Sequence, residues 1–324
     1  MDLPPPPFAG LLGPGPRAKP RIACVGAANV DVKAQCLGDV VLGSSNPVSL
    51  SKELGGVARN VAEALARLRC EVAMVSRVGA DAAGDQMVTN LNDLAISTAM
   101  VSRSLTAPTA TYTALLAPDG EMIVAFADMA IYDEVTADSV EALAVDLAAY
   151  DLWFLDANLP AAALECLLDA KPVDVMLAVD PVSVSKSGNI GRQLDRVDLL
   201  FCNRDEAAAL AGMRIRAPLD VTEAAHRLRA SGVGAVVITL GEEGAFVCSD
   251  RVYDFFPALP AAKVDVTGAG DALVAGVLYG QGIGLPLDQA VGYGLASAAL
   301  ALETTATVNP NLSPNTLYQR YPAG

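Results

Sequence analysis

The chain has 324 residues, of which 52% are hydrophobic and 18% charged, and its formal net charge is −15. So high an apolar fraction excludes an intrinsically disordered chain and allows a large α/β domain. The acidic balance argues against nucleic-acid and membrane partners, because an acidic surface repels phosphate backbones and anionic lipids.

Histidine and cysteine usage narrows the chemistry further. His226 is the only histidine, which excludes HExxH zinc sites and multi-histidine metal clusters, and its helical surroundings favour a surface position. The six cysteines include no Cys-x-x-Cys pair, so neither a zinc ribbon nor a redox motif is expected. Apolar surroundings indicate buried thiols, and the reducing cytoplasm is the predicted compartment.

The first twenty residues are rich in proline. This composition predicts an extended arm over residues 1–20, and it lacks the apolar core of a signal peptide. The longest uncharged apolar run, Ala272–Leu287, contains several glycines and is too short to span a membrane. We therefore expect one catalytic domain over residues 21–324.

From Arg21 onward, short continuous apolar runs alternate with helical patterns. The expected strands are Ile22–Val25, Val72–Val75, Leu152–Leu155, Val175–Val179, Leu199–Phe201 and Val236–Leu240. The expected helices are Val57–Arg69, Ala83–Leu94, Thr136–Ala148, Ala161–Leu168, Arg204–Ala211, Val221–Ala230, Ala269–Tyr279 and Leu287–Leu302. This βαβα order predicts a parallel sheet with helices on both faces.

Two segments interrupt this alternation. The stretch of about 32–54 is too long for a βα loop and reads as extended chain, and 109–126 reads as a hairpin around Pro118-Asp119-Gly120. Together they predict a small β-sheet that acts as a lid, the alternative being an edge extension of the central sheet. Unpaired edges and an apolar face on such a lid favour a homodimer.

The sharpest motif is Val266-Thr267-Gly268-Ala269-Gly270-Asp271. Small residues opening an apolar helix leave backbone N–H groups uncovered at its positive end, which suits an anion. An acid there is expected to be held ionised by the helix dipole and to accept a proton, as phosphoryl transfer requires. The alternative is an acidic cap on a tightly packed helix.

Further polar and small residues follow the predicted strands, where ligands of open α/β sheets bind. Asn29 and Asp31 are two residues apart on extended chain, so their side chains are expected to point the same way and to hold vicinal hydroxyls. Gly55 and Gly56 precede the helix that carries Asn60, and they allow a polar ligand to approach the backbone closely. Carboxylate chemistry makes Glu206 a candidate for Mg²⁺ through water. The remaining candidates are Asn203 for phosphate, and Thr239, Gly241 and Gly244 for a nucleotide.

The Gly55-Gly56…Asn60 element, the Asn203…Glu206 pair and the Asp265–Asp271 segment resemble the ribokinase (PfkB) family of carbohydrate and nucleoside kinases. The resemblance extends from about Gly26 to Ser313. It implies a three-layer αβα sandwich with a mostly parallel central sheet and a β-lid. It also implies ATP- and Mg²⁺-dependent phosphorylation of a sugar hydroxyl.

The resemblance also implies roles for individual residues. Asp271 matches the catalytic base, and Gly268, Ala269 and Gly270 match the anion hole. Substrate-binding positions are matched by Asn29, Asp31, Gly55, Gly56 and Asn60, and positions around ATP and Mg²⁺ by Asn203, Glu206, Thr239 and Gly241. Asp265 and Thr267 sit where many members bind a monovalent cation such as K⁺.

Finer features, such as Asn29-Val30-Asp31-Val32 and Asp180-Pro181-Val182-Ser183 with Lys186, resemble family members that phosphorylate pseudouridine at its 5′-hydroxyl. Two features depart from the family's pattern. Val57 stands where ribokinase-like members usually carry a lysine, and the Gly241-Glu242-Glu243-Gly244 loop carries acids on the nucleotide side, where phosphates are expected. The extra N–H of pseudouridine requires an acceptor, for which the lid offers Ser45, Asn46, Thr111 and Thr113, with Asn46 preferred. The alternatives are a ribokinase- or adenosine kinase-like enzyme and a catalytically silent nucleoside-binding protein.

Overall fold

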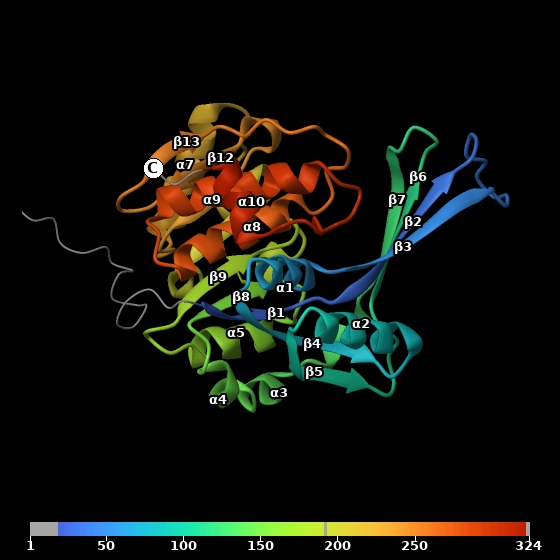
Figure 1. Ribbon diagram of the computed structural model, residues 1–324, viewed down its shortest axis with the longest axis horizontal. Helices are drawn as coiled ribbons and strands as arrows, with labels where there is room; N and C mark the ends of the chain where they lie inside the picture. Colours follow the sequence, from blue (N-terminus) through green and yellow to red (C-terminus); the bar gives the residue numbers. More distant parts are fainter. Residues whose placement is uncertain (1–18, 191–192, 322–324) are drawn as a thin grey trace, which may run out of the picture.

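The computed structural model describes residues 19–190 and 193–321 (Figure 1). The arm predicted over residues 1–20 therefore lies outside the described residues, apart from Lys19 and Pro20. Pro20 is buried against Gly282, where a Cβ atom would lie 2.7 Å from the proline ring. The packed domain thus already includes Pro20.

The described chain forms a nine-stranded sheet in the order β13-β12-β11-β10-β9-β8-β1-β4-β5. Its strands from β5 to β11 pair in parallel, whereas β12 and β13 pair antiparallel at one edge. The bounds are β1 (Arg21–Val25), β4 (Glu71–Gly79), β5 (Ser97–Ser104), β8 (Leu152–Asp156), β9 (Met176–Asp180), β10 (Leu199–Asn203), β11 (Val236–Thr239), β12 (Ala245–Cys248) and β13 (Tyr253–Phe256). The six predicted strands are confirmed.

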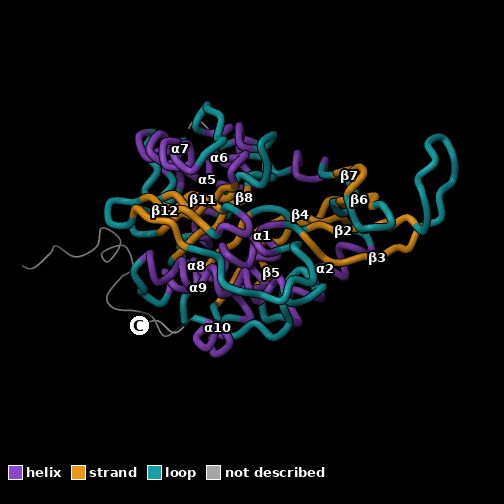
Figure 2. Tube along the Cα trace, turned by 90° about the horizontal axis from the view of Figure 1, so that it is seen from above, coloured by secondary structure: helices purple, strands orange, loops and turns teal. Residues whose placement is uncertain are grey.

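Helices cover both faces of this sheet because its strands are apolar on both faces. In β1, Ile22 and Cys24 enter one core, while Ala23 and Val25 enter the other. The first core packs against α1 (Val57–Arg67), α2 (Ala82–Asp93), α8 (Ala269–Gly282), α9 (Leu287–Leu302) and α10 (Pro314–Arg320). The second packs against α3 (Ala137–Glu141), α4 (Ala144–Leu147), α5 (Ala161–Ala170), α6 (Arg204–Leu210) and α7 (Pro218–Ala230). Figure 2 shows the sheet between these layers, so the αβα sandwich is confirmed.

A second, smaller sheet projects from the sandwich (Figure 1). It consists of β2 (Asn29–Cys36), β3 (Val48–Gly55), β6 (Thr111–Leu116) and β7 (Met122–Asp128), in the order β3-β2-β6-β7. Its strands are hydrogen-bonded to one another and belong to neither edge of the nine-stranded sheet. The alternative of an edge extension is therefore wrong, and we call these four strands the small sheet.

Some elements differ from the sequence-based expectations. The single helix expected over Thr136–Ala148 is wrong, because the chain tightens at Leu143, whose N–H bonds to the carbonyl of Val140 three residues back, and divides into α3 and α4. Strands β5, β12 and β13 and helix α10 were not predicted. Strand β5 mixes exposed and buried positions at the sheet edge, so it has no continuous apolar run to reveal it.

Candidate active site

The chain passes from the nine-stranded sheet to the small sheet through a short segment after β1. Gly26 in this segment has φ 149°, and a Cβ atom there would lie 2.2 Å from the carboxyl carbon of Asp156. Only a residue without a side chain fits this close approach. The small sheet is thus attached directly at the carboxyl edge of the central strands.

Asp156 is a buried carboxylate that organises this junction, and it was missing from the predicted site. Its Oδ2 accepts hydrogen bonds from the backbone N–H groups of Ala27 and Ala58, both at 2.9 Å. Its Oδ1 accepts from the backbone and the side-chain amide of Asn158, both at 2.9 Å. Asp156 therefore joins the end of β1 to the first turn of α1. Asp156 directly follows the apolar run Leu152–Leu155, and this position was the signal in the sequence that could have identified it as a site residue.

The predicted substrate-binding residues of the small sheet lie together. The Asn29 amide donates to Asp31 Oδ1 at 2.6 Å, and Asn29 pairs with Gly55 across β2 and β3. A Cβ atom on Gly55 would lie 2.0 Å from Asp31 Oδ2, and one on Gly56, where φ is 101°, would lie 2.4 Å from the carbonyl oxygen of Ala27. The two glycines thus make room for the Asp31 carboxylate and for the turn into α1.

Asn60 connects this group to the predicted catalytic base. It is buried in the first turn of α1, and its Nδ2 donates to Asp271 Oδ2 at 2.8 Å. Asp271 lies in the first turn of α8, which packs against α1. Residues 211 positions apart in the chain therefore meet at the N-terminus of α8.

The helix dipole was expected to hold Asp271 ionised, but the pKa of Asp271 is raised and not lowered. Burial of the carboxyl group raises its pKa to about 7, which the hydrogen bond from Asn60 only partly opposes. The carboxylates of Asp156 and Asp31 raise the pKa further by like-charge repulsion. A carboxylate with a pKa near neutrality is a stronger proton acceptor than an exposed aspartate, so this environment favours general-base chemistry.

The predicted anion hole, Gly268–Gly270, lies at the start of α8. Gly268 caps α8 in the left-handed conformation, with φ 77°, and a Cβ atom there would lie 2.2 Å from the carbonyl oxygen of Thr307. The N–H groups of the first helical turn have no acceptor within the helix. A Cβ atom on Gly270 would meet no protein atom within 4 Å. The turn can therefore be approached closely by a ligand.

A cavity of about 620 Å³ adjoins the anion hole. Thr239, Gly241 and Gly244 line one side of it, and Ala269 and Gly270 line another. Most of the remaining wall is apolar, with Leu259, Leu273, Leu295, Ala298, Ala299 and Leu302. The cavity has the size and lining expected for the base and ribose of a nucleotide.

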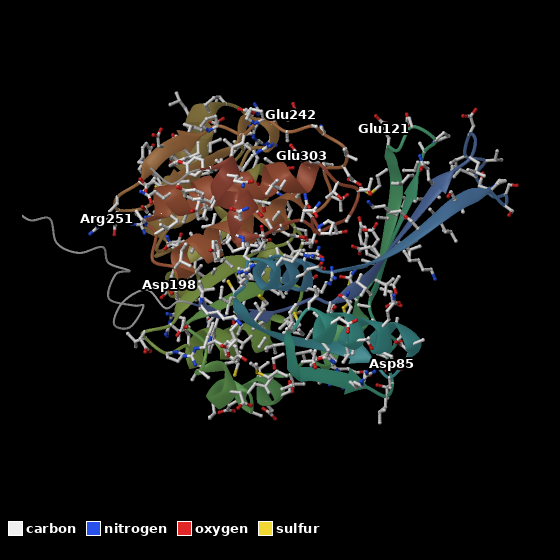
Figure 3. The ribbon with its side chains drawn as sticks, viewed as in Figure 1. Asp85, Glu121, Asp198, Glu242, Arg251 and Glu303 are labelled. Carbon is white, nitrogen blue, oxygen red and sulfur yellow. The ribbon has the colours of Figure 1, made fainter. Side chains whose placement is uncertain are left out.

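Gly244 has a structural requirement in addition to its place in the cavity wall. Its φ is 101°, and a Cβ atom there would lie 2.0 Å from the carbonyl oxygen of Phe256. The acids of the same loop are exposed and paired: Glu242 with Lys263 at 3.0 Å, and Glu243 with Arg204 at 2.7 Å. Figure 3 labels Glu242 on the sandwich. Their charges are therefore neutralised at the surface.

Asn203 and Glu206 form a reciprocal cap at the start of α6. Asn203 Oδ1 accepts from the backbone N–H of Glu206, and Glu206 Oε2 accepts from the backbone N–H of Asn203, at 2.9 and 2.8 Å. Burial raises the pKa of Glu206 against these hydrogen bonds. The cap gives both side chains a structural role, and it leaves Glu206 at the edge of the sheet where a water-mediated Mg²⁺ contact was predicted.

A second carboxylate and a lysine lie at this edge and were not among the predicted site residues. Asp180 ends β9, and burial, with repulsion from Glu206, raises its pKa well above the usual range. Val182, which donates its N–H to Asp180 Oδ1 at 2.7 Å, has φ 64°, a strained conformation for a β-branched residue. Lys186 donates to Asn158, and burial lowers its pKa. Strain and buried charge in one loop are typical of functional sites.

Two predicted base-contacting residues do not join the Asp31 group. Asn46 uses its amide within the loop between β2 and β3: Oδ1 accepts from Val41 N–H at 2.8 Å, and Nδ2 donates to the carbonyls of Val41 and Ser44. Thr111 pairs with Val30, whereas Asp31 pairs with Tyr112. Because side chains alternate along a strand, Thr111 lies on the opposite face of the small sheet from Asp31.

Metal-ligand clusters and membrane-spanning helices are both absent from residues 19–190 and 193–321. No group of three or more His, Cys, Asp or Glu side chains there could hold a metal ion. Within the same residues, no helix combines the length and the apolar character needed to cross a membrane.

A family model, curated relatives and solved structures all match this chain to carbohydrate or nucleoside kinases. The family model described as pfkB family carbohydrate kinase matches residues 19–314. A pseudouridine kinase from Escherichia coli is 31% identical over 92% of this chain and 95% of its own, and one from Arabidopsis thaliana is 27% identical over 88% and 91%. The solved structure of a carbohydrate kinase from Agrobacterium tumefaciens superposes with a TM-score of 0.82 and 28% identity, over 93% of this chain and 97% of its own.

Proposed function

Because the chain belongs to the pfkB family of carbohydrate kinases, we propose that it transfers the γ-phosphoryl group of ATP to the 5′-hydroxyl of pseudouridine. The observation that carries the chemistry is the position of Asp271, which is hydrogen-bonded to Asn60 and lies in the first turn of the helix that Gly268 caps. A proton acceptor beside an anion-binding turn is what transfer to a hydroxyl requires.

In the proposed reaction, Asp271 accepts the proton of the 5′-hydroxyl as that oxygen bonds to the γ-phosphorus. The bond between this phosphorus and the oxygen bridging to the β-phosphate breaks, and the electron pair leaves with ADP. Backbone N–H groups at Gly268–Gly270 stabilise the charge on the transferred group, because they are fixed in place before the reaction begins. Asp31 and Asn29 orient the ribose by accepting and donating hydrogen bonds.

The cavity beside Gly270 supports the assignment of ATP, since its apolar walls suit a nucleobase and Thr239 and Gly241 lie at its polar end. Mg²⁺, held by the nucleotide phosphates and through water by Glu206, would neutralise charge on the phosphates as ADP departs. We also assign the enzyme to the cytoplasm, in keeping with its six free cysteines.

The choice of pseudouridine rests on the relatives and on the Asp180–Lys186 segment. Another sugar or nucleoside is the alternative within the family, and a silent nucleoside-binding protein is the alternative outside it. The survival of both Asp271 and the anion-binding turn favours an enzyme, because a binding protein has no chemical use for that carboxylate.

An ADP-release assay with pseudouridine, uridine, ribose, adenosine and fructose 6-phosphate tests the function. We expect the highest kcat/KM for pseudouridine, at least about tenfold above uridine, because a site that provides an acceptor for the additional ring N–H of pseudouridine leaves that acceptor unpaired when uridine binds. Phosphorus NMR of the product should show a 5′-phosphate. Preference for another compound would establish the alternative within the family, and binding without ADP release would establish the silent protein.

We also propose that the small sheet is a lid over the sugar and that two copies pair through it. Its face opposite Asp31 carries Leu50, Val124 and Phe126, of which Leu50 is 62% and Phe126 63% exposed. A second copy of the chain would cover this apolar face and the free strand edges. Light scattering is expected to give about twice the 33.3 kDa chain mass.

The matched variants for this dimer are Phe126→Glu and Tyr318→Glu. Both residues are exposed aromatic side chains, but Tyr318 lies on α10 of the sandwich. We expect the first variant to be monomeric and the second to remain a dimer. A wild-type monomer, or a dimer unaffected by Phe126→Glu, would contradict the proposal.

A further inference from the structure

A lysine of the small sheet reaches the loop that leads into the anion hole. Lys33 lies two residues after Asp31 on β2, so both side chains are on the same face. Its ammonium group lies 3.2 Å from Asp265 Oδ2 and 3.3 Å from Thr267 Oγ1. This contact joins residues 232 positions apart and connects the small sheet to the sandwich.

The donors around Asp265 account for both oxygens of its carboxylate. Oδ1 accepts from the backbone N–H of Thr267 at 2.9 Å and from its hydroxyl at 2.8 Å, and Oδ2 faces Lys33. Burial raises the pKa of Asp265, but the hydrogen bonds from Thr267 and the charge of Lys33 outweigh it and lower the pKa. The carboxylate is thus ionised, and it already has a cationic partner.

The loop that contains Thr307 also forms a hydrogen bond with the small sheet. Glu53, on β3 next to Asp31 in the register, accepts a hydrogen bond from Thr307 Oγ1 at 2.8 Å. The carbonyl oxygen of Thr307 is the atom against which Gly268 packs. The small sheet therefore contacts both loops that fix the N-terminus of α8.

An inorganic cation does not fit beside this arrangement. A monovalent ion on Asp265 would stand within a few ångströms of the Lys33 ammonium, and like charges at that separation repel strongly where water is partly excluded. Lys33 already provides one positive charge and two hydrogen-bond donors to the loop. The monovalent cation that the family resemblance implies for Asp265 and Thr267 is therefore at odds with the observed contacts.

We propose that Lys33 is the resident cation of the Asp265–Thr267 loop, a positioning residue that replaces an inorganic monovalent ion and holds the anion hole in register with the lid. The proposal rests on the proposed kinase function for its effect on turnover. The expected effect of Lys33 on potassium binding does not depend on the kinase function, because the Lys33–Asp265 ion pair exists in the protein without substrate.

The test compares Lys33→Met, Lys33→Arg and Lys52→Met with the wild type. Lys52 is the matched control, since it is an exposed lysine of the same sheet that pairs with Val32 and so lies on the opposite face. Thermal unfolding is measured in potassium chloride and in tetramethylammonium chloride at equal ionic strength. This measurement requires neither a substrate nor activity.

For the wild type, Lys33→Arg and Lys52→Met, we expect that the unfolding temperature of each protein is the same in potassium chloride as in tetramethylammonium chloride. Lys33→Met should unfold about 1–3 °C lower without potassium and should regain that loss with it, because the ion can then occupy the vacated position. In the kinase assay its kcat should fall about tenfold without potassium and recover with it, while the sugar KM changes less than about twofold.

Potassium stabilisation of the wild type, or a Lys33→Met variant that behaves like Lys52→Met in both salts, would overturn the proposal. If the wild type phosphorylates no compound in the panel, the proposed function fails, yet the unfolding temperatures still decide the role of Lys33. If Lys33→Met does not fold, Lys33→Gln in the two salts provides the same comparison.

Discussion

Replacing Asp271 with asparagine is expected to lower kcat by about 10²–10⁴, the usual contribution of a general base. The amide has the shape of the carboxyl group but cannot take the proton of a hydroxyl. Stability should not fall, because the replacement keeps the volume of the side chain and removes a carboxyl group whose ionisation is disfavoured by burial. Circular dichroism and the KM for ATP should stay near wild-type values while turnover falls.

The matched control for this variant is Asp288→Asn. Asp288 is also an acid in the first turn of an apolar helix, α9, but it is exposed. It should retain wild-type turnover. Wild-type turnover in Asp271→Asn would instead remove Asp271 from the mechanism and leave it as a helix cap.

The pH dependence provides a second readout of the same group. Because the pKa of Asp271 is raised to about 7 and the base acts in its ionised form, kcat/KM should rise with pH up to about 7 and then level off. The Asn60 hydrogen bond lowers this pKa, so Asn60→Ala should move the rising limb to higher pH. A limb near pH 4, or one that moves to lower pH in Asn60→Ala, would show that Asp271 is not the titrating group.

Replacing Asp31 with alanine is expected to raise the KM for the nucleoside at least about tenfold. Each hydrogen bond to a charged group contributes about 1.5–3 kcal/mol, and the carboxylate is placed to accept two from vicinal hydroxyls. The KM for ATP should remain near its wild-type value, because the cavity beside Gly270 is built from other residues. Steady-state kinetics with each substrate varied in turn measures both constants.

Asp119→Ala is the control, since it removes the same charge from an exposed position in the turn between β6 and β7. Figure 3 labels its neighbour Glu121 at the end of the small sheet. This variant should leave both KM values unchanged. A loss of ATP affinity with unchanged nucleoside affinity in Asp31→Ala would show that the two halves of the cleft are assigned the wrong way round.

The central strands and the start of α8 followed from the sequence alone. Continuous apolar runs such as Ile22–Val25 identified the central strands, because parallel strands are covered on both faces. The Gly268–Gly270 segment was predicted to open a helix whose first backbone N–H groups are left uncovered by small residues, and α8 begins there. Both inferences depend only on neighbouring residues.

The tertiary structure decided what depends on residues far apart in the chain. The pKa of Asp271 is near 7 because its carboxyl group is buried and the charges of Asp156 and Asp31 raise it further, although the hydrogen bond from Asn60 lowers it. No local sequence pattern reports that burial. The register of the small sheet decided that Thr111 and Asp31 lie on opposite faces. In the same way, the pairing of Lys33 with Asp265 depends on how the small sheet meets the sandwich. Desolvation, strand register and long-range ion pairs are properties of packing, whereas the sequence by itself determines the elements that pack.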